Sequence, residues 1–544
     1  MERNSQRGAD LSMKRILSRR ELIRGTATIG AASLFGLTIN EAQAIPPHRV
    51  PLWSNEADVV IVGFGGAGGN AAISAHDSGA RTLIIEKMPS AGGNSAVSGA
   101  GMLVPDNVPD AIRYYRALSS GTVDEDSIRV FAEAMVGIPD LLKKLGIEFT
   151  VKKALPHFPS LPGSSTISKR IQFRPPGSGK IKFKALFDLV EKRRISVLFN
   201  TSAKALIQIP ETKEVVGVKA DSAGKEIYIK ANRGVVLTCG GYEYSQEMLA
   251  YFNIPGLSEF IFPWGSPGNT GDGIRMALGA GADLWHMCCL EWGPFCAKAP
   301  SKKFGFAVGA GLEEASIGNF IFVNKYGKRF MNERKSPVHR KETLEITRLD
   351  DERAEYPNLP SYMIFDETYR LKGPIVATQQ YYELFFGGPV GYPMVHNVHE
   401  WSQDNNVEIE KEWIIKADTL KDLALKIKGD PQGLEETVRK FKEYALTGKD
   451  LEFGRPKASM APIETPPFYA VEIGLSLFNT QGGPKHNTHC QVLDPYNRPI
   501  SRLYAAGELG SFFGFLYQGG NNFQEAWAFG RLAGKNAASE TPLK

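Results

Sequence analysis

The pattern of hydrophobic positions is most regular early in the chain. Residues 58–62 form an apolar run that predicts a buried strand, and residues 81–85 predict a second strand that ends at Glu86. Between the two strands, a glycine-rich turn at 63–68 leads into a helical pattern through Ser78. Strand, helix and strand in this order are typical of an α/β fold with a parallel sheet.

Later stretches continue in the same style. Residues 195–238 alternate β-rich runs with turns such as that at 222–225, which predicts a β-meander. Gly271 precedes a helical pattern that continues through Ala280. Residues 466–544 return to strand, turn and helix. No internal repeat or low-complexity tract interrupts this organisation.

The segment 298–465 differs from both of its flanks. It is richer in charge and proline, and its charges follow a helical pattern at 417–446, as expected for a solvated helix face. We therefore predict that 298–465 is an inserted α+β domain. The rest of the main domain then consists of residues 55–297 and 466–544.

The turn after the first strand carries the spacing of a dinucleotide-binding fingerprint, Gly63-x-Gly65-x-x-Gly68. The first glycine permits the tight turn, the second lets the backbone approach a pyrophosphate, and the third lets helix and strand pack closely. The helix N-terminus then presents N–H groups to the phosphates. Glu86, at the end of the second strand, is placed to accept hydrogen bonds from the adenosine ribose.

Other glycine-rich segments favour FAD over NAD. The fingerprint occurs once, so one dinucleotide is expected. The segments 92–95 and 98–101 are superfluous for NAD but useful for a longer cofactor. Near the C-terminus, 503–508 predicts a strand that ends in an acid, and 519–522 begins a helix through Gly534. Such a helix start can stabilise the negative charge of reduced flavin. We predict one noncovalent FAD per chain.

Charge and cysteine content exclude several classes of protein. The 544 residues suggest two to four domains. Of the net charge of +5, the first 44 residues carry +3, with seven Lys/Arg and four Asp/Glu, so the remainder has no basic footprint for nucleic acid. None of the five cysteines has the C-x-x-C spacing of haem or cluster sites, and we predict no metal site. Adjacent Cys288 and Cys289 are either a redox pair or inert buried thiols.

The first 44 residues have the order of an export signal. Ser18–Arg24 resembles the twin-arginine motif, a mildly apolar stretch follows at 25–39, and Ala42-Gln43-Ala44 is a small-x-small cleavage site. The apolar stretch is too short and too rich in small residues to span a bilayer. We predict export of the folded protein by the twin-arginine machinery to the periplasm or another extracytoplasmic location. An amphipathic N-terminal helix is the alternative.

Taken together, these motifs resemble the fumarate reductase/succinate dehydrogenase flavoprotein superfamily. The most similar groups in it are soluble fumarate reductases, urocanate-type reductases and 3-ketosteroid dehydrogenases. The resemblance covers roughly residues 56–544. It rests on the segments 63–68, 92–95, 269–273, 322–333 and 504–522 and on Glu86.

The resemblance implies a fold and a cofactor site. The fold is a Rossmann-like FAD-binding domain of the GR2 type, with 298–465 as a capping domain that holds the substrate against the flavin. Together with the fingerprint, the implied FAD-binding residues are Gly63, Gly65, Gly66, Ala67, Gly68, Glu86, Lys87, Gly93, Asn94, Ser95, Gly99, Ala100, Gly101, Ala203, Asp272, Glu508, Gly520, Asn521, Asn522 and Phe523.

Departures from the family pattern bear on the substrate. Where fumarate reductases have a His and an Arg that hold carboxylates, this chain has Asn479 and Tyr517; ketosteroid dehydrogenases have a Tyr at the second position. The position of the proton-donating Arg is Pro337, and His339 and Arg340 are candidates to replace it. The alternatives are core packing for Tyr517 and a solvated face for the other two. Further acid/base candidates in the cap are Tyr362, Tyr381, Tyr382 and Tyr392.

We predict an FAD-dependent oxidoreductase that acts on a CH–CH or C=C bond next to a carbonyl. Tyr517 would polarise the carbonyl oxygen, and His339 or Arg340 would move the proton. The rival functions are an exported reductase of an unsaturated carboxylate and a redox-inert flavin or electron carrier. Because no second dinucleotide site is present, electrons would pass to or from a quinone, a cytochrome or a separate redox protein.

Overall fold

The computed structural model describes residues 42–312, 318–334, 345–377 and 399–543. Its first sheet has eight strands, five of which run parallel in the order β20-β9-β1-β2-β6. The parallel strands are β1 (Asn55–Val62), β2 (Thr82–Ile85), β6 (Ser196–Leu198), β9 (Lys225–Leu237) and β20 (Pro499–Ala505). The predicted α/β fold with a parallel sheet is confirmed.

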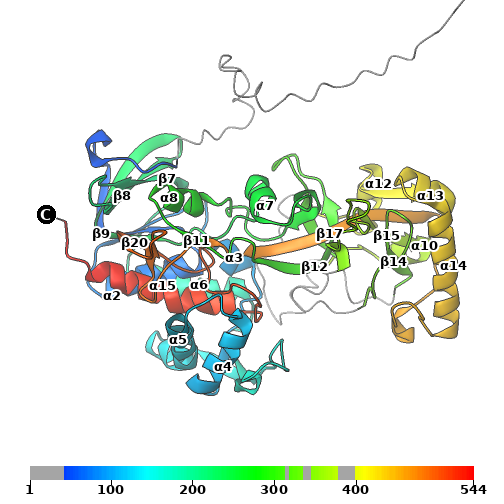
Figure 1. The fold of residues 1–544 in the computed structure, drawn as a ribbon, viewed down its shortest axis with the longest axis horizontal. Helices are drawn as coiled ribbons and strands as arrows, with labels where there is room; N and C mark the ends of the chain where they lie inside the picture. Colours follow the sequence, from blue (N-terminus) through cyan, green and yellow to red (C-terminus); the bar gives the residue numbers. More distant parts are fainter. Residues whose placement is uncertain (1–41, 313–317, 335–344, 378–398, 544) are drawn as a thin grey trace, which may run out of the picture. The chain divides into compact units, whose positions relative to one another are not determined.

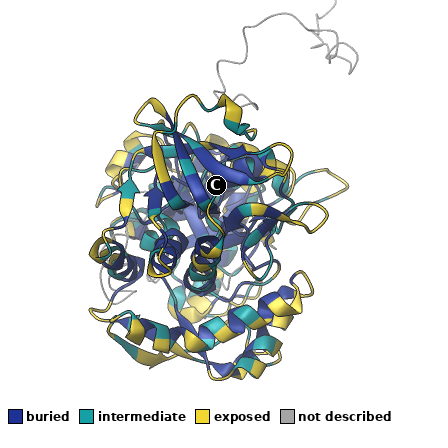
Figure 2. Cartoon of the chain, turned by 90° about the vertical axis from the view of Figure 1, so that its left-hand side faces the viewer, coloured by how far each residue is buried: buried dark blue, intermediate teal, exposed yellow. Residues whose placement is uncertain are grey.

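Helices α2 (Gly66–Asp77), α6 (Gly179–Lys192) and α15 (Asn521–Ser539) pack together beside this sheet (Figure 1). Val59, Ile61 and Ile84 contribute fully buried side chains to the core beneath them. The alternate residues Val60, Val62, Leu83 and Ile85 are buried in the core on the other face of the sheet. Burial of both faces explains why the strands are continuous apolar runs rather than alternating ones. Figure 2 colours the chain by burial: α2 is buried at every residue from Gly66 to Ala75, whereas α6 has both buried and exposed residues.

The predicted β-meander is also confirmed. After β6 the chain forms β7 (Thr201–Gln208), β8 (Val215–Ser222) and β9, and the antiparallel pairs β7–β8 and β8–β9 complete one side of the sheet. Strand β19 (Gln491–Leu493) pairs with β20 at the other edge. Ile45 forms a bridge to Ile207 of β7, so the segment just after the predicted cleavage site lies on this sheet.

A second, seven-stranded sheet is built around the long strand β17 (Phe468–Thr480). It also contains β10 (Ile261–Pro263), β12 (Leu290–Ala299), β13 (Val308–Gly311), β14 (Phe320–Asn324), β15 (Ser361–Asp366) and β16 (Ile414–Ala417). Because β12 extends across residue 298, it joins the main domain to the predicted insertion. The domain boundaries themselves stay predictions.

The helical charge pattern at 417–446 corresponds to two helices, α13 (Leu420–Lys426) and α14 (Pro431–Thr447). The break between them has a local cause: Asp430 caps α14, and Pro431 occupies its first position. Leu423, Leu434 and Phe441 point into a small separate core with β14 and β15. The charged residues thus lie on the exposed side, as predicted.

A third, three-stranded sheet was not predicted from the sequence. Its order is β3-β5-β4, with β3 (Leu103–Pro105), β4 (Phe149–Lys153) and β5 (Ile167–Phe173), and helices α4 (Val108–Ser119) and α5 (Glu125–Lys144) precede β4 (Figure 1). In the described part of the chain, no helix combines the length and the apolar character needed to cross a membrane.

Candidate active site

The turn between β1 and α2 has the geometry of a dinucleotide cradle. Gly63 has φ of +102°, and a Cβ on Gly68 would lie 1.9 Å from the Gly63 carbonyl oxygen, so neither position tolerates a side chain. At Gly65 a Cβ would meet nothing closer than the Gly92 oxygen at 3.8 Å. Glycine at position 65 is therefore not needed to avoid a clash within the protein. Its lack of a side chain instead keeps the space above the α2 N-terminus open.

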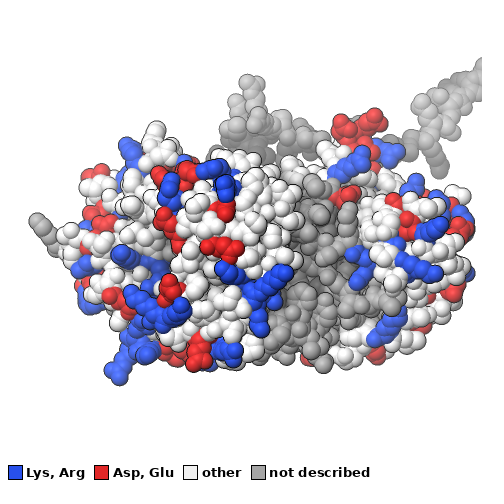
Figure 3. All heavy atoms as spheres, turned by 90° about the horizontal axis from the view of Figure 1, so that it is seen from below, with Lys and Arg blue, Asp and Glu red and all other residues white. Residues whose placement is uncertain are grey.

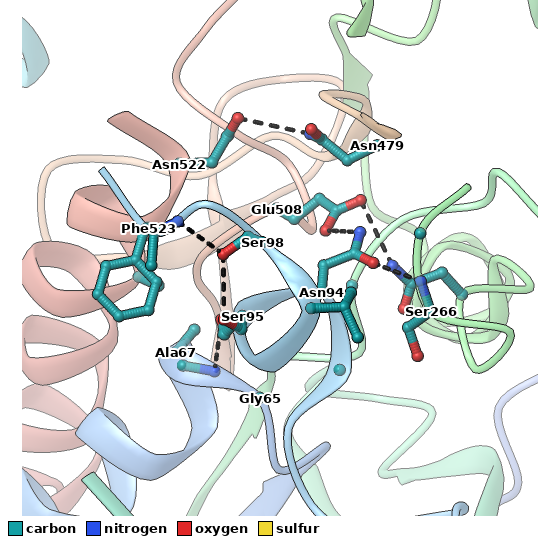
Figure 4. A pocket seen from close by; sticks show the side chains of 18 of the residues that line it. Gly65, Ala67, Asn94, Ser95, Ser98, Ser266, Asn479, Glu508, Asn522 and Phe523 are labelled. Atoms are coloured by element: carbon teal, nitrogen blue, oxygen red, sulfur yellow. Dashed lines mark hydrogen bonds between the residues drawn. The ribbon is translucent and has the colours of Figure 1, made fainter. Parts of the chain in front are cut away.

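A cavity of about 790 Å³ runs from this turn into the interior. Its walls include every predicted FAD-binding residue except Gly68 and Asn521. Gly68 is used in helix–strand packing, and Asn521 is fully buried beside Tyr115. Figure 4 shows side chains from β1–α2, the 94–98 segment and the start of α15 around one space. The sequence motifs therefore converge on a single site.

At one end of the cavity, Glu86 is already engaged by the backbone. Its Oε2 accepts a hydrogen bond from Phe64 N (2.7 Å), and its Oε1 accepts one from Met88 N (2.8 Å). Burial raises the pKa of Glu86. The carboxylate therefore holds the 63–68 turn in place, and its remaining lone pairs can still accept hydrogen bonds from a ribose.

We expect Glu86→Ala to weaken FAD binding about 10- to 150-fold, because hydrogen bonds to a charged acceptor contribute about 1.5–3 kcal/mol. Glu86→Gln is the matched control, since it keeps the shape and one acceptor and should lose less. The measurement is titration of the apoprotein with FAD by flavin fluorescence. Unchanged affinity in Glu86→Ala would show that other groups hold the ribose.

A pair of buried carboxyl groups lies beside the middle of the cavity. Asn94 Nδ2 donates to both Glu243 Oε1 and Glu508 Oε2, each at 2.8 Å, and Asn269 Nδ2 also donates to Glu243 Oε1 at 2.8 Å. Burial raises the pKa of Glu243, and burial together with the neighbouring Glu243 charge raises that of Glu508. The pair therefore retains a proton at pH values where an exposed glutamate has lost it.

Glu508 was predicted as a cofactor residue, whereas Glu243 was missed. The available signal was its place just after Gly240-Gly241, at the carboxyl end of a parallel strand, where ligands of such sheets bind. At the other side, Lys87 Nζ pairs with Asp272 Oδ2 at 2.7 Å. Burial acts to raise the pKa of Asp272, but the Lys87 charge and hydrogen bond lower it overall. Both predicted residues thus lie together on the cavity wall.

A second polar network supports the start of α15. Asn522 Nδ2 donates to Gln481 Oε1 (2.8 Å) and to Glu525 Oε2 (3.2 Å). Glu525 also accepts hydrogen bonds from Phe512 N (2.6 Å) and from Ser511 Oγ (2.7 Å). Burial raises the pKa of Glu525 to about 8. This network orients Asn522 at the cavity and was not foreseen from the sequence.

The raised pKa of Glu525 predicts a pH-dependent stability. In the unfolded chain this carboxyl loses its proton near pH 4.3, whereas in the folded protein it keeps the proton to about pH 8. The free energy of unfolding should therefore fall as pH rises from about 4.5 to 8. Urea unfolding of the apoprotein at several pH values measures this. Glu525→Gln should flatten the profile, and the exposed control Glu435→Gln should not; equal profiles would contradict the assignment.

Tyr517 lies at the α15 end of the cavity. Its phenol oxygen accepts hydrogen bonds from Gly520 N and Asn522 N, both at 3.1 Å. The ring packs edge-on against Phe513, with centroids 5.3 Å apart, and the residue is only 7% exposed. Burial raises the pKa of Tyr517, and the Glu291 charge acts in the same direction, so the phenol stays protonated. Tyr517 thus contributes both to the core and to the cavity wall.

Two further side chains line the cavity near Tyr517. Asn479 of β17 donates to Asn522 Oδ1 at 3.4 Å (Figure 4), and Glu291 of β12 is its cross-strand partner and is almost fully buried. Glu291 was not predicted. A single acidic residue within an apolar run belongs to no recognisable motif, so the sequence did not indicate that Glu291 lies at the site.

The remaining acid/base candidates are distributed as follows. His339, Arg340, Tyr381, Tyr382 and Tyr392 lie outside the described residues. Tyr362 donates to the Ile427 carbonyl at 3.3 Å and is not on the cavity wall. Cys288 is exposed and Cys289 is buried, and they do not form a disulfide with each other.

Comparison with known proteins places this site in context. The profile of a family described as "FAD binding domain" matches residues 58–523. A probable fumarate reductase of Shewanella frigidimarina is 27% identical, covering 89% of this chain and 75% of its own. A 3-oxosteroid 1-dehydrogenase of Mycolicibacterium smegmatis is 26% identical, covering 89% and 97%. The crystal structure of a 3-ketosteroid delta1-dehydrogenase from Sterolibacterium denitrificans is similar in fold, with a TM-score of 0.71, 24% identity, and coverage of 89% and 100%.

Proposed function

Because the chain belongs to the FAD binding domain family, we propose that it is an FAD-dependent oxidoreductase acting on a CH–CH or C=C bond next to a carbonyl. The observation that carries this proposal is Tyr517, a buried phenol on the cavity wall at the start of α15. The two relatives of this chain described above, a probable fumarate reductase and a 3-oxosteroid 1-dehydrogenase, support the same proposal.

The cradle fits FAD. The backbone at Gly63–Gly68 leaves room for a diphosphate at the α2 N-terminus, and the cavity is long enough to reach a second helix start at Gly520. Glu86 would bind the ribose, Glu508 and Asn94 the middle of the cofactor, and Asn522 and Phe523 the flavin. When bound, FAD supplies hydride exchange at its N5 atom.

Tyr517 would bind the carbonyl oxygen of the substrate. Its oxygen accepts two backbone hydrogen bonds, which hold the phenol at the cavity wall, and its O–H would donate to the bound substrate. The phenol O–H would stabilise the negative charge that develops on the substrate oxygen, as in an oxyanion site. The Gly520 and Asn522 N–H groups would in turn stabilise the electron density that this hydrogen bond draws onto the phenol oxygen. Asn479 supplies a second, uncharged donor at the same end of the cavity.

A proton has to move at the other carbon of the bond. We propose that His339 or Arg340 moves this proton, with Glu291 as a further candidate because its carboxyl group lines the cavity beside Tyr517. Replacing each in turn and measuring solvent isotope effects on turnover would separate them. A residue whose replacement leaves both turnover and isotope effect unchanged is not the proton carrier.

Reduction of an unsaturated carboxylate is the second candidate. Two observations favour it: one relative is a probable fumarate reductase, and the cations Arg170 and Lys182 line the same cavity. Anaerobic stopped-flow mixing of the holoenzyme with enones, aromatic acrylates, fumarate and saturated ketones distinguishes the two. If no compound oxidises or reduces the flavin, the protein is instead a redox-inert flavin binder or electron carrier.

We further propose that FAD is held noncovalently and that the protein is exported. Acid precipitation should release FAD into the supernatant, and flavin retained in the pellet would contradict noncovalent binding. Replacing Arg19 and Arg20 by lysine should keep the precursor in the cytoplasm, and unchanged export would exclude the twin-arginine route. In that location a quinone, a cytochrome or a separate redox protein would exchange electrons with the flavin.

A further inference from the structure

Strands β4 and β5 place like charges directly opposite each other. Lys152 faces Arg170, and Lys153 faces Lys169, in adjacent cross-strand pairs of exposed residues. Directly opposed like charges destabilise a sheet. The positive charge of Lys169 is compensated by an ion pair with Asp106 (Nζ–Oδ1 2.6 Å). We call β4, β5 and the loop through His157 the hairpin face. Figure 3, seen from the side of α4 and α5, shows several groups of Lys and Arg.

The hairpin face borders the cavity. Arg170 and Gln172 of β5 line it, and Ile171 N donates to the Met102 carbonyl at 2.7 Å, next to the 99–101 segment. Behind them, the buried Lys182 of α6 donates to the carbonyl oxygens of Ala100 and Ile171. Burial, with the Arg170 charge, lowers the pKa of Lys182 to about 7. Basic side chains thus extend from the surface to the proposed flavin end.

Apolar side chains accompany these charges on the surface. Val151 is 51% exposed and Leu155 is 74% exposed. Just beyond them, the His157 backbone N–H donates to Gln518 Oε1 at 2.9 Å, and its Nδ1 accepts from Gly519 N at 3.2 Å. The loop therefore connects an exposed apolar and basic surface to the residues that precede α15.

We infer that the hairpin face is the docking surface of an anionic electron-transfer protein. This inference rests on the proposed function, because an oxidoreductase with one dinucleotide site has to exchange electrons with another molecule. A positive surface steers a negative partner and raises the rate of encounter. Two small exposed apolar groups suit the limited contact of transient redox complexes. The repulsion between Lys152 and Arg170 is then relieved when acidic groups of the partner bind.

Stopped-flow oxidation of the reduced holoenzyme tests this assignment. The enzyme is photoreduced and mixed with a small acidic ferric haem protein or with a basic one of similar size. Two ferric haems each take one electron from the reduced flavin, and the released protons pass to water. The test variant is Lys152→Glu/Lys153→Glu. The matched control is Lys213→Glu/Lys225→Glu, which reverses two exposed charges away from the cavity wall, one just before β8 and one at the start of β9.

For the unaltered enzyme, we expect the rate constant with the acidic haem protein to fall at least about tenfold between 10 and 200 mM salt. Lys152→Glu/Lys153→Glu should lower the rate constant with the acidic haem protein about tenfold at low salt, and the control variant should lower it less than twofold. The rate constant with the basic haem protein should not fall in either variant. The test variant should also unfold at a higher temperature, because glutamate opposite Arg170 removes the repulsion.

Equal rate constants in the test and control variants would overturn the docking assignment. Turnover of small molecules in the panel described above is measured on the same variants. If that turnover is normal while the haem proteins react equally with all variants, the docking surface is wrong but the proposed function holds. If no small molecule oxidises or reduces the flavin, the proposed function fails, whatever the haem proteins do.

Discussion

Replacing Tyr517 by phenylalanine is expected to lower turnover of an enone or ketone substrate about 10²–10³-fold, the typical effect of losing one oxyanion donor. The phenol is buried, lines the cavity and already accepts two backbone hydrogen bonds. Its replacement removes the donor at the point where negative charge develops on the substrate oxygen. The measurement is steady-state turnover with the best substrate of the panel, together with FAD content.

Tyr362→Phe is the matched control, since that phenol binds the Ile427 carbonyl and does not line the cavity. It should keep nearly full turnover. Because Tyr517→Phe also removes the acceptor for Gly520 N and Asn522 N, FAD affinity has to be shown unchanged before the loss is assigned to the substrate. Full activity of Tyr517→Phe would exclude the proposed role.

The same end of the cavity is expected to select a neutral carbonyl over a dicarboxylate. Tyr517 and Asn479 provide hydrogen bonds without charge, and Glu291 adds a carboxyl group beside them. A buried carboxylate without a charge partner costs many kcal/mol. Fumarate should therefore leave the reduced enzyme unoxidised, and rapid reoxidation by fumarate would contradict this expectation and favour the carboxylate reductase.

The second large effect is expected at the fingerprint glycines. Gly65→Ala should weaken FAD binding, whereas Gly68→Ala should destabilise the fold. A Cβ at Gly65 meets no protein atom closer than 3.8 Å, and its φ of −91° suits alanine. The apoprotein should keep its stability within about 0.5 kcal/mol. FAD affinity should fall about 5- to 150-fold, because overpacking typically costs about 1–3 kcal/mol and the methyl group occupies the diphosphate space.

Gly68→Ala should instead destabilise the protein itself. The added Cβ would lie 1.9 Å from the Gly63 carbonyl oxygen, so α2 would have to move away from β1. We expect a loss of about 1–3 kcal/mol or more in the free energy of unfolding of the apoprotein. Urea unfolding and FAD titration of both variants separate the two effects. Equal loss of apoprotein stability in both would contradict the distinct roles.

The sequence predicted those parts of the site that depend on neighbours along the chain. The cradle at 63–68 and the strand ending in Glu86 follow from local spacing, and both have the expected geometry. Glu243 could not be paired with Glu508 because 265 positions separate two residues that only the fold brings to Asn94. The three-stranded sheet was missed because β4 and β5 are short and polar, without the alternation that marks a half-buried strand.

The close approach of Gly101 and Gly520 has a consequence for biosynthesis. A Cβ on either residue would lie within 2.8 Å of the other's Cα, and β20 lies beside β9 in the sheet that contains β1. The proposed flavin end of the pocket is therefore closed by a segment that is synthesised after β17. A nascent chain that has emerged only as far as β17 contains the diphosphate cradle but lacks the wall residues Tyr517, Gly520 and Asn522. The complete pocket therefore forms only after the chain through the start of α15 has been synthesised.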